Sequence, residues 1–144
     1  MKVNYKPSGF NDVTAYLVVK NAEAVIEFAE KVFDAVIMVK MEDHDKIMHA
    51  EFQIGDTIIM IGNGAENSKL FPGMLYVYVE DTDVTYKKAI EAGAKSIMEP
   101  QDKFYGNRNA AVEDCCGNQW WIATHRENLT QEQLEDRLEE EMNH

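Results

Sequence analysis

His49 and Glu51 are the residues whose types and spacing best suit chemistry. They stand two positions apart in the segment IMHAEFQIGD, which alternates in polarity and predicts a β-strand. Residues two apart on a strand share one face, with their side-chain origins about 6.5 to 7 Å apart. An imidazole and a carboxylate placed in this way could act as general acid and base near neutral pH, where histidine titrates.

The same pair also has a structural interpretation. His49 could be a partly buried histidine whose ring is satisfied by Glu51 or by the backbone, and one pair alone falls short of a complete catalytic site. Two protein ligands would also hold a metal ion weakly. The sequence leaves both interpretations open.

Further candidates are Arg108 and a pair of neighbouring cysteines, Cys115 and Cys116. The Arg108 guanidinium could bind a ligand carboxylate through two hydrogen bonds, or pair with an internal acid such as Glu113 or Asp114. The cysteines begin a predicted turn without an adjacent basic residue to activate a thiol, so we expect them to fill the turn. Two adjacent cysteines cannot build a disulfide framework, which favours a cytoplasmic protein.

Two predicted β-hairpins must position these groups. The first turns at Gly55, and the second turns at Gly117 within residues 104–125. Strand alternation places Trp120 and Trp121 on opposite faces of the second hairpin. We expect Trp120 to lie under a helix and Trp121 to lie in a ligand cleft.

The two hairpins belong to two copies of one unit. A strand precedes a helix capped by Asn21, and the same order recurs at a helix capped by Asp81. The two caps stand 60 positions apart and the two turn glycines 62. We interpret this as a duplicated βαβββ unit over residues 12–62 and 73–125, with VIMVK and KSIME as second strands. The predicted fold class is α+β, and the buried helix stripes are predicted as Val25, Phe28, Ala29 and Val32, then Val84 and Ile90.

Composition limits the possible partners. The chain has 144 residues, 45% of them apolar, and lacks an apolar run long enough to span a membrane. We expect one domain over residues 1–127 and an acidic helix over 128–144, capped by Thr130 with Gln133 three residues later. The net charge of −12 disfavours nucleic acid and mildly favours a cationic ligand.

The tandem units, with YLVVKNAEAVIEF in the first, HAEFQIGD in its hairpin and YGNRNAAVEDCCGNQWWIATH closing the second, resemble the vicinal oxygen chelate superfamily. This is the glyoxalase and bleomycin-resistance fold, and the likeness is greatest to its PhnB-like branch. The resemblance covers residues 12–127 and implies curved mixed sheets around a cleft, helices on the convex side and a homodimer.

Metal-dependent members of that superfamily place His, Gln or Glu ligands at four equivalent positions. The resemblance carries these positions onto Thr14, Ile59, Met74 and Trp121. Ile and Trp have no donor lone pair, and Thr and Met bind hard or borderline cations poorly. No cofactor is therefore expected, although a divalent metal bound elsewhere stays open.

The strand face that points away from the helices is expected to be aromatic with a few polar groups, which is typical of a small-molecule site. Strand alternation is expected to place Ile59 and Ile61 on this face as well. Candidate ligand-binding residues are Tyr16, Tyr76, Tyr78, Arg108 and Trp121. The first functional interpretation is a protein that binds a small apolar or cationic molecule. The second is an enzyme of the superfamily, a lyase, isomerase or oxygenase, that uses His49 and Glu51 or an atypical metal. A third is an interaction module that uses its sheet edges and acidic tail.

Overall fold

The computed structural model describes residues 2–143, so Met1 and His144, the ends of the predicted segments, lie outside the described residues. The chain divides into two compact units, residues 1–73 with 115–117 and residues 74–114 with 118–144. The predicted tandem βαβββ units and the α+β class are confirmed. Each unit contains one four-stranded mixed sheet.

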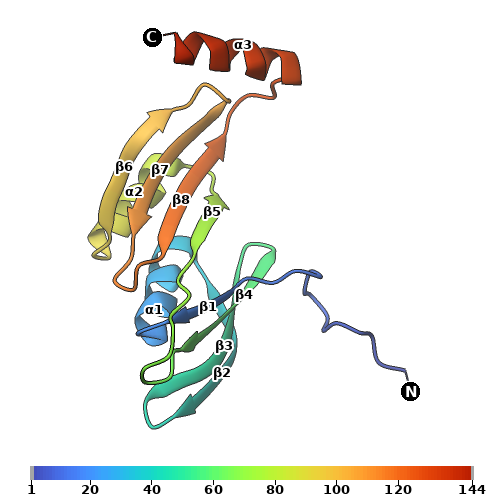
Figure 1. Cartoon of the computed structure of the whole chain (residues 1–144), viewed down its shortest axis with the longest axis vertical. Helices are drawn as coiled ribbons and strands as arrows, with labels where there is room; N and C mark the ends of the chain where they lie inside the picture. Colours follow the sequence, from blue (N-terminus) through green and yellow to red (C-terminus); the bar gives the residue numbers. More distant parts are fainter. Residues whose placement is uncertain (1, 144) are drawn as a thin grey trace. The chain divides into compact units, whose positions relative to one another are not determined.

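The first sheet has the strand order β1-β4-β3-β2. Its outer strand β1 runs parallel to β4, and the other neighbours are antiparallel. Helix α1 packs on one face through β3 and β4 (Figure 1). The elements are β1 (Tyr16–Val19), α1 (Ala22–Phe33), β2 (Val36–Asp43), β3 (Lys46–Ile54) and β4 (Thr57–Asn63).

The second sheet repeats this topology in the order β5-β8-β7-β6. Strand β5 is parallel to β8, and helix α2 packs on one face through β6, β7 and β8 (Figure 1). The elements are β5 (Met74–Tyr78), α2 (Thr82–Glu91), β6 (Lys95–Asp102), β7 (Asn107–Glu113) and β8 (Gln119–His125). Each sheet therefore has one face covered by its own helix and one face that we call the open face.

Helix α1 forms where its cap and its apolar stripe predict it. The Asn21 side chain accepts a hydrogen bond from the backbone N–H of Ala24, which satisfies one free donor of the first turn. The predicted stripe is confirmed, because all four of its residues are buried: Val25, Phe28, Ala29 and Val32. The apolar stripe anchors α1 on the sheet.

The predicted stripe of α2 is wrong. Val84 and Ile90 are 52% and 38% exposed, whereas Thr82, Thr85 and Ala89 are buried. A polar contact fixes the rotation of the helix, because the Thr82 hydroxyl donates to the backbone carbonyl of Arg108 at 2.8 Å. A threonine can lie on a buried face when its hydroxyl is hydrogen-bonded, and apolar periodicity does not detect this.

The predicted face of β4 is also wrong. Ile59 and Ile61 were expected on the open face, but both are buried, and Ile59 stands opposite Phe52 on the helix-covered side. Strand β4 is apolar along most of its length, so alternation does not reveal its phase. The residues of β4 on the open face are Ile58, Met60 and Gly62.

A third helix follows the second sheet. Helix α3 (Gln131–Met142) begins with the predicted capping box, in which Thr130 and Gln133 exchange side-chain and backbone hydrogen bonds. Arg137 fastens it by donating to the Phe104 carbonyl at 3.1 Å and to both Glu127 carboxylate oxygens at 2.9 Å. Within residues 2–143, no helix is long and apolar enough to cross a membrane.

Candidate functional site

The open face of the first sheet carries a hydrogen-bonded row of three side chains. His49 and Glu51 lie on β3 with their Nε2 and Oε2 atoms 2.9 Å apart. On the other side of the imidazole, the Tyr16 hydroxyl lies 2.9 Å from Nδ1. The structure therefore joins the expected acid and imidazole pair and adds Tyr16 from β1, which the sequence suggested only as an aromatic wall.

Partial burial makes this row suitable for proton transfer. The side chains of His49 and Glu51 are 22% and 16% exposed, while Tyr16 is 44% exposed. Shielded hydrogen bonds of this kind are stronger than exposed ones, and Tyr16 is the member of the row that is most accessible to a partner molecule. The row can hold an imidazole in one tautomer and move a proton along it.

The open face of the second sheet carries the aromatic candidates. Tyr76 on β5 stands opposite Trp121 on β8, and Tyr78 follows on the same face, with its ring 5.4 Å from that of Tyr76. Tyr78 is 64% exposed, and Trp121 is half-buried with its indole N–H donating to Gln119 Oε1 at 3.1 Å. These side chains present flat apolar surface that a ligand ring can stack on.

A polar cluster lies beside these aromatic rings. The Tyr76 hydroxyl accepts hydrogen bonds from Asn107 Nδ2 at 3.1 Å and Asn109 Nδ2 at 2.8 Å. Asn109 Nδ2 also donates to the Tyr105 hydroxyl at 2.7 Å. Burial, followed by the influence of Tyr76, raises the pKa of Tyr105 above the ordinary tyrosine value, so its O–H stays intact at neutral pH.

Asn109 itself is fully buried, and its Oδ1 atom has no hydrogen-bond partner among the described residues. A buried acceptor without a donor costs about 1 to 3 kcal/mol. Such an atom therefore marks a place where a donor from outside the chain would be favourable.

His125 extends the polar cluster at the end of β8. Its Nδ1 lies 2.9 Å from Asn107 Oδ1, and its Nε2 lies 2.8 Å from Asn128 Oδ1. Asn107, Asn109 and Tyr105 were not among the site residues predicted from the sequence. Alternation along β7 would have placed both asparagines on the face of Tyr76 once the pairing with β8 was assumed.

Arg108 lies on the helix-covered side and not beside the aromatic residues. Its guanidinium donates to Asp83 through Nε at 2.7 Å and Nη2 at 2.9 Å, and to Asp102 at 3.2 Å. Arg108 therefore pairs with acids of its own chain, as the second interpretation of this residue expected. The partners are Asp83 and Asp102 and not the expected Glu113 or Asp114. Hydrogen bonds from Arg108 lower the pKa of Asp83.

The four positions that the resemblance assigns to metal ligands do not fit an ion. Ile59 faces the helix, and Met60, which replaces it on the open face, offers only a thioether. Thr14 lies before the first residue of β1, and Trp121 has no donor lone pair. Among residues 2–143, no group of three or more His, Cys, Asp or Glu side chains could hold a metal ion.

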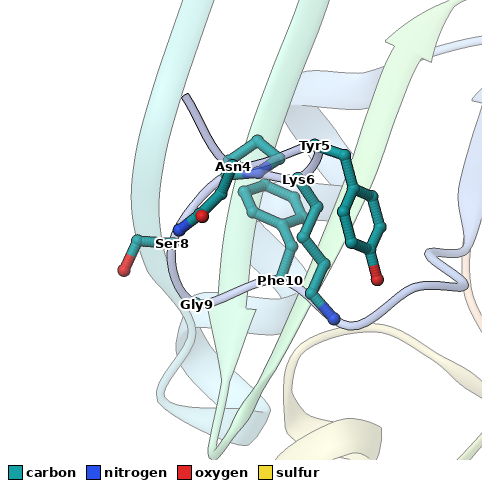
Figure 2. A pocket seen from close by; sticks show the side chains of 7 residues that line it. Asn4, Tyr5, Lys6, Ser8, Gly9 and Phe10 are labelled. Carbon is teal, nitrogen blue, oxygen red and sulfur yellow. The ribbon is translucent and has the colours of Figure 1, made fainter. Parts of the chain in front are cut away.

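The N-terminal segment forms a separate hollow of about 230 Å³, lined by residues 4–10 (Figure 2). The Tyr5 hydroxyl donates to Asp12 Oδ1 at 3.0 Å, and the Lys6 ammonium forms an ion pair with the same carboxylate. Gly9 lies against Ile58, since a Cβ there would be 3.6 Å from Ile58 Cδ1. The lining comes from one short segment, and none of the candidate residues contributes to it.

The comparisons with known proteins agree with the fold. A family model described as the Glyoxalase/Bleomycin resistance protein/Dioxygenase superfamily matches residues 9–122. An uncharacterized protein of Mycobacterium bovis is 28% identical over 132 residues, which cover 83% of this chain and 84% of that protein. An uncharacterized protein of Mycobacterium tuberculosis is also 28% identical over 132 residues, which cover 83% of this chain and 75% of that protein.

Three solved structures show the same fold at low identity. TioX from Micromonospora sp. ML1 aligns with a TM-score of 0.68 and 21% identity, over 80% of this chain and 98% of that chain. The PhnB protein from Bacillus cereus has a TM-score of 0.64 and 16% identity, over 79% and 99%. The fosfomycin resistance protein FosX from Mesorhizobium loti has a TM-score of 0.61 and 17% identity, over 86% and 97%.

Proposed function

The chain belongs to the Glyoxalase/Bleomycin resistance protein/Dioxygenase superfamily, and from this premise we propose that it binds a small organic molecule. The molecule lies on the open face of the second sheet, and the divalent ion of metal-dependent relatives takes no part. Aromatic stacking replaces metal coordination at the position of Trp121, because an indole can stack on a ligand ring but has no lone pair to donate to a metal ion.

The unpaired Asn109 Oδ1 is the observation that carries this proposal. Its Nδ2 is held by the hydroxyls of Tyr76 and Tyr105, so the amide cannot turn to another partner without breaking two hydrogen bonds. A ligand N–H or O–H donor would satisfy the remaining oxygen. Since Asn109 is fully buried, we expect such a donor to enter beside Tyr105, which is only partly buried.

The charge of the protein selects the class of ligand. The chain carries a net charge of −12, and the Trp121, Tyr76 and Tyr78 rings present π-faces that attract cations. We therefore expect a planar apolar or cationic molecule with an N–H group, such as an aromatic amine or amidine. Cys115 and Cys116 are thiols in this structure, which suits a reducing compartment and supports binding in the cytoplasm.

Titration with proflavine, a planar aromatic cation with two amino groups, tests the proposal through its fluorescence. Wild-type protein should bind it, and Trp121→Ala and Asn109→Leu should each weaken binding by about tenfold or more, as the loss of one stacking or one hydrogen-bonding group would. Tyr86→Ala serves as a control aromatic on α2. Unchanged affinity in both variants would show that the open face of the second sheet is not the binding site. Separately, mass spectrometry of compounds retained on purification of the wild-type protein identifies the natural ligand.

A second candidate function has its own supporting observation. The 2.9 Å hydrogen bond between His49 and Glu51 on the open face of the first sheet supports an enzyme of the superfamily that uses this pair as acid and base. Turnover of a ligand identified by mass spectrometry, lost in His49→Ala and kept in Trp121→Ala, would favour this function over binding alone.

A further inference from the structure

We infer that Tyr16, His49 and Glu51 form a proton relay whose outer end is the Tyr16 hydroxyl. This inference deepens the second candidate function and rests on it for the presence of a reaction. Its new content is the role of Tyr16, which becomes the group that touches the substrate, while His49 takes up the proton and Glu51 positions the imidazole.

The hydrogen bonds fix the direction of the relay. Glu51 Oε2 is an acceptor when ionised, so His49 Nε2, 2.9 Å away, must donate its proton to it. A neutral imidazole then has its lone pair on Nδ1. The Tyr16 hydroxyl, 2.9 Å from Nδ1, is left to donate its proton to that lone pair. The phenol oxygen therefore keeps its own lone pairs available to accept a proton from an approaching molecule.

The surroundings of Tyr16 leave space for its hydroxyl. Gly62 lies on the neighbouring strand β4, and a Cβ there would be 2.8 Å from the Met48 carbonyl and 3.4 Å from the Tyr16 hydroxyl oxygen. The hydroxyl thus sits over a residue without a side chain. The imidazole and phenol rings are 5.5 Å apart and tilted by 36°, so they are held together along the row.

The step that the relay performs is balanced without a cofactor. A substrate X–H bond breaks and its proton joins the Tyr16 oxygen, while the original phenol proton moves to His49 Nδ1. The products are X with its electron pair, an intact phenol and an imidazolium held by Glu51. The reverse sequence returns the proton.

The relay favours a cationic proton donor. Before the step it carries the single negative charge of Glu51, and after the step it is neutral overall. A cationic N–H acid, such as an ammonium or amidinium group, is attracted to the first state and leaves as a neutral base from the second. Such a substrate is released as a free amine or amidine, ready to act as a nucleophile.

Acetylation by N-acetylimidazole tests the relay in the absence of any ligand. The phenol oxygen attacks the acetyl carbon, the C–N bond breaks, and the phenol proton passes through His49 to the departing imidazole. Peptide mass spectrometry measures the rate at each of the six tyrosines. Exposure alone ranks Tyr5 (86%) and Tyr78 (64%) ahead of Tyr16 (44%), whereas the relay predicts that Tyr16 reacts first.

Three variants separate the relay from a structural role. His49→Gln should lower the Tyr16 rate about 100-fold relative to Tyr5 in the same molecule, in line with the loss of general-base assistance. Glu51→Ala should lower it in part, and Glu51→Gln should restore some of that loss, because an amide oxygen can still accept from Nε2. His44→Gln is the matched control, since that imidazole is 95% exposed beside Asp43 and should change nothing.

Two acetylation results would overturn the relay: a wild-type Tyr16 rate that follows exposure, or a Tyr16 rate unaffected by His49→Gln. If His49→Gln fails to fold, the nitrogen-15 NMR spectrum of wild-type histidines gives the answer, because a neutral His49 with its proton on Nδ1 contradicts the inference. No ligand enters either measurement. A negative result here therefore leaves ligand binding on the second sheet standing, and failure of proflavine binding leaves the relay standing.

Discussion

The buried Trp120 donates its indole N–H to Asp114 Oδ2 at 2.9 Å. The same carboxylate accepts from the Asn118 side chain at 2.9 Å and from its backbone N–H at 3.1 Å. One acid thus fastens both the core indole and the turn at Gly117, where φ is +82°. Trp120 therefore anchors the hairpin in the core, while Trp121 is half-buried on the open face.

We predict that Trp120→Ala is far more destabilising than Trp121→Ala. Loss of the fully buried Trp120 ring should cost about 3 to 5 kcal/mol and leave Asp114 without one of its donors. Loss of Trp121 should cost much less, because its ring is partly solvated. Urea unfolding of both variants measures the difference. Equal losses of stability, with retained compounds unchanged, would show that Trp121 belongs to the core and not to a ligand site.

Tyr105 should make the protein less stable in alkali. Burial raises its pKa in the folded state, so above pH of about 10 the unfolded chain loses this proton while the folded chain keeps it. The contribution to stability is complete below the unfolded pKa and is lost as pH rises through the folded value. Tyr105→Phe should reduce the fall in melting temperature between about pH 9 and about pH 11, a window set around the ordinary tyrosine pKa. Tyr5→Phe should leave this fall unchanged.

Arg108→Gln should destabilise the protein at neutral pH and lose this effect in acid. Hydrogen bonds from Arg108 lower the pKa of Asp83, so their contribution is present above the unfolded value of 3.8 and disappears as pH falls through the lower folded value. Melting curves between neutrality and acid should therefore converge for variant and wild type. Arg126→Gln is the comparison variant and should show a much smaller convergence, because the Arg126 charge makes the smallest contribution to the lowered pKa of Asp83 and its ion pair to Asp102 spans 3.8 Å. A gap in melting temperature that stays constant with pH would contradict the prediction.

The fold could be predicted further than the site, for physical reasons. Caps, turn glycines and the alternation of β8 are local signals, so the repeated units and the opposite orientations of Trp120 and Trp121 follow from the sequence. The rotation of α2 depends on the hydrogen bond of Thr82 to a distant strand, which no local pattern encodes. The hydrogen-bond partner of His49 is Tyr16, which lies 33 positions away in the sequence, and only the register of the sheet brings the two together.

Purified protein should contain well under one equivalent of Zn, Ni, Mn or Fe per chain. The reason is the donor set, because Met60, Met74 and Trp121 offer neither carboxylate nor imidazole on the open faces, and His49 with Glu51 supplies only two ligands. Elemental analysis after dialysis measures the content. A stoichiometric metal that is lost in His49→Ala would contradict the binding function and favour a metal-dependent enzyme.

The final prediction is that the chain forms a homodimer through strand β2. This strand is the outer strand of its sheet, and it exposes Val36, Met38, Val39 and Met41 at 39% to 59%. An edge with exposed apolar residues invites pairing with another strand, and a second copy offers an identical edge related by two-fold symmetry.

Light scattering at micromolar concentration should therefore give about 33 kDa, twice the 16.5 kDa of one chain. Val39→Lys should shift the mass toward that of a single chain, because a charge on the edge disfavours strand pairing. Val84→Lys is the matched control, since Val84 is similarly exposed but lies on α2. A wild-type mass near 16.5 kDa would refute the dimer. A dimer that persists in Val39→Lys and dissociates in Val84→Lys would instead move the interface from the edge of the first sheet to the helix of the second.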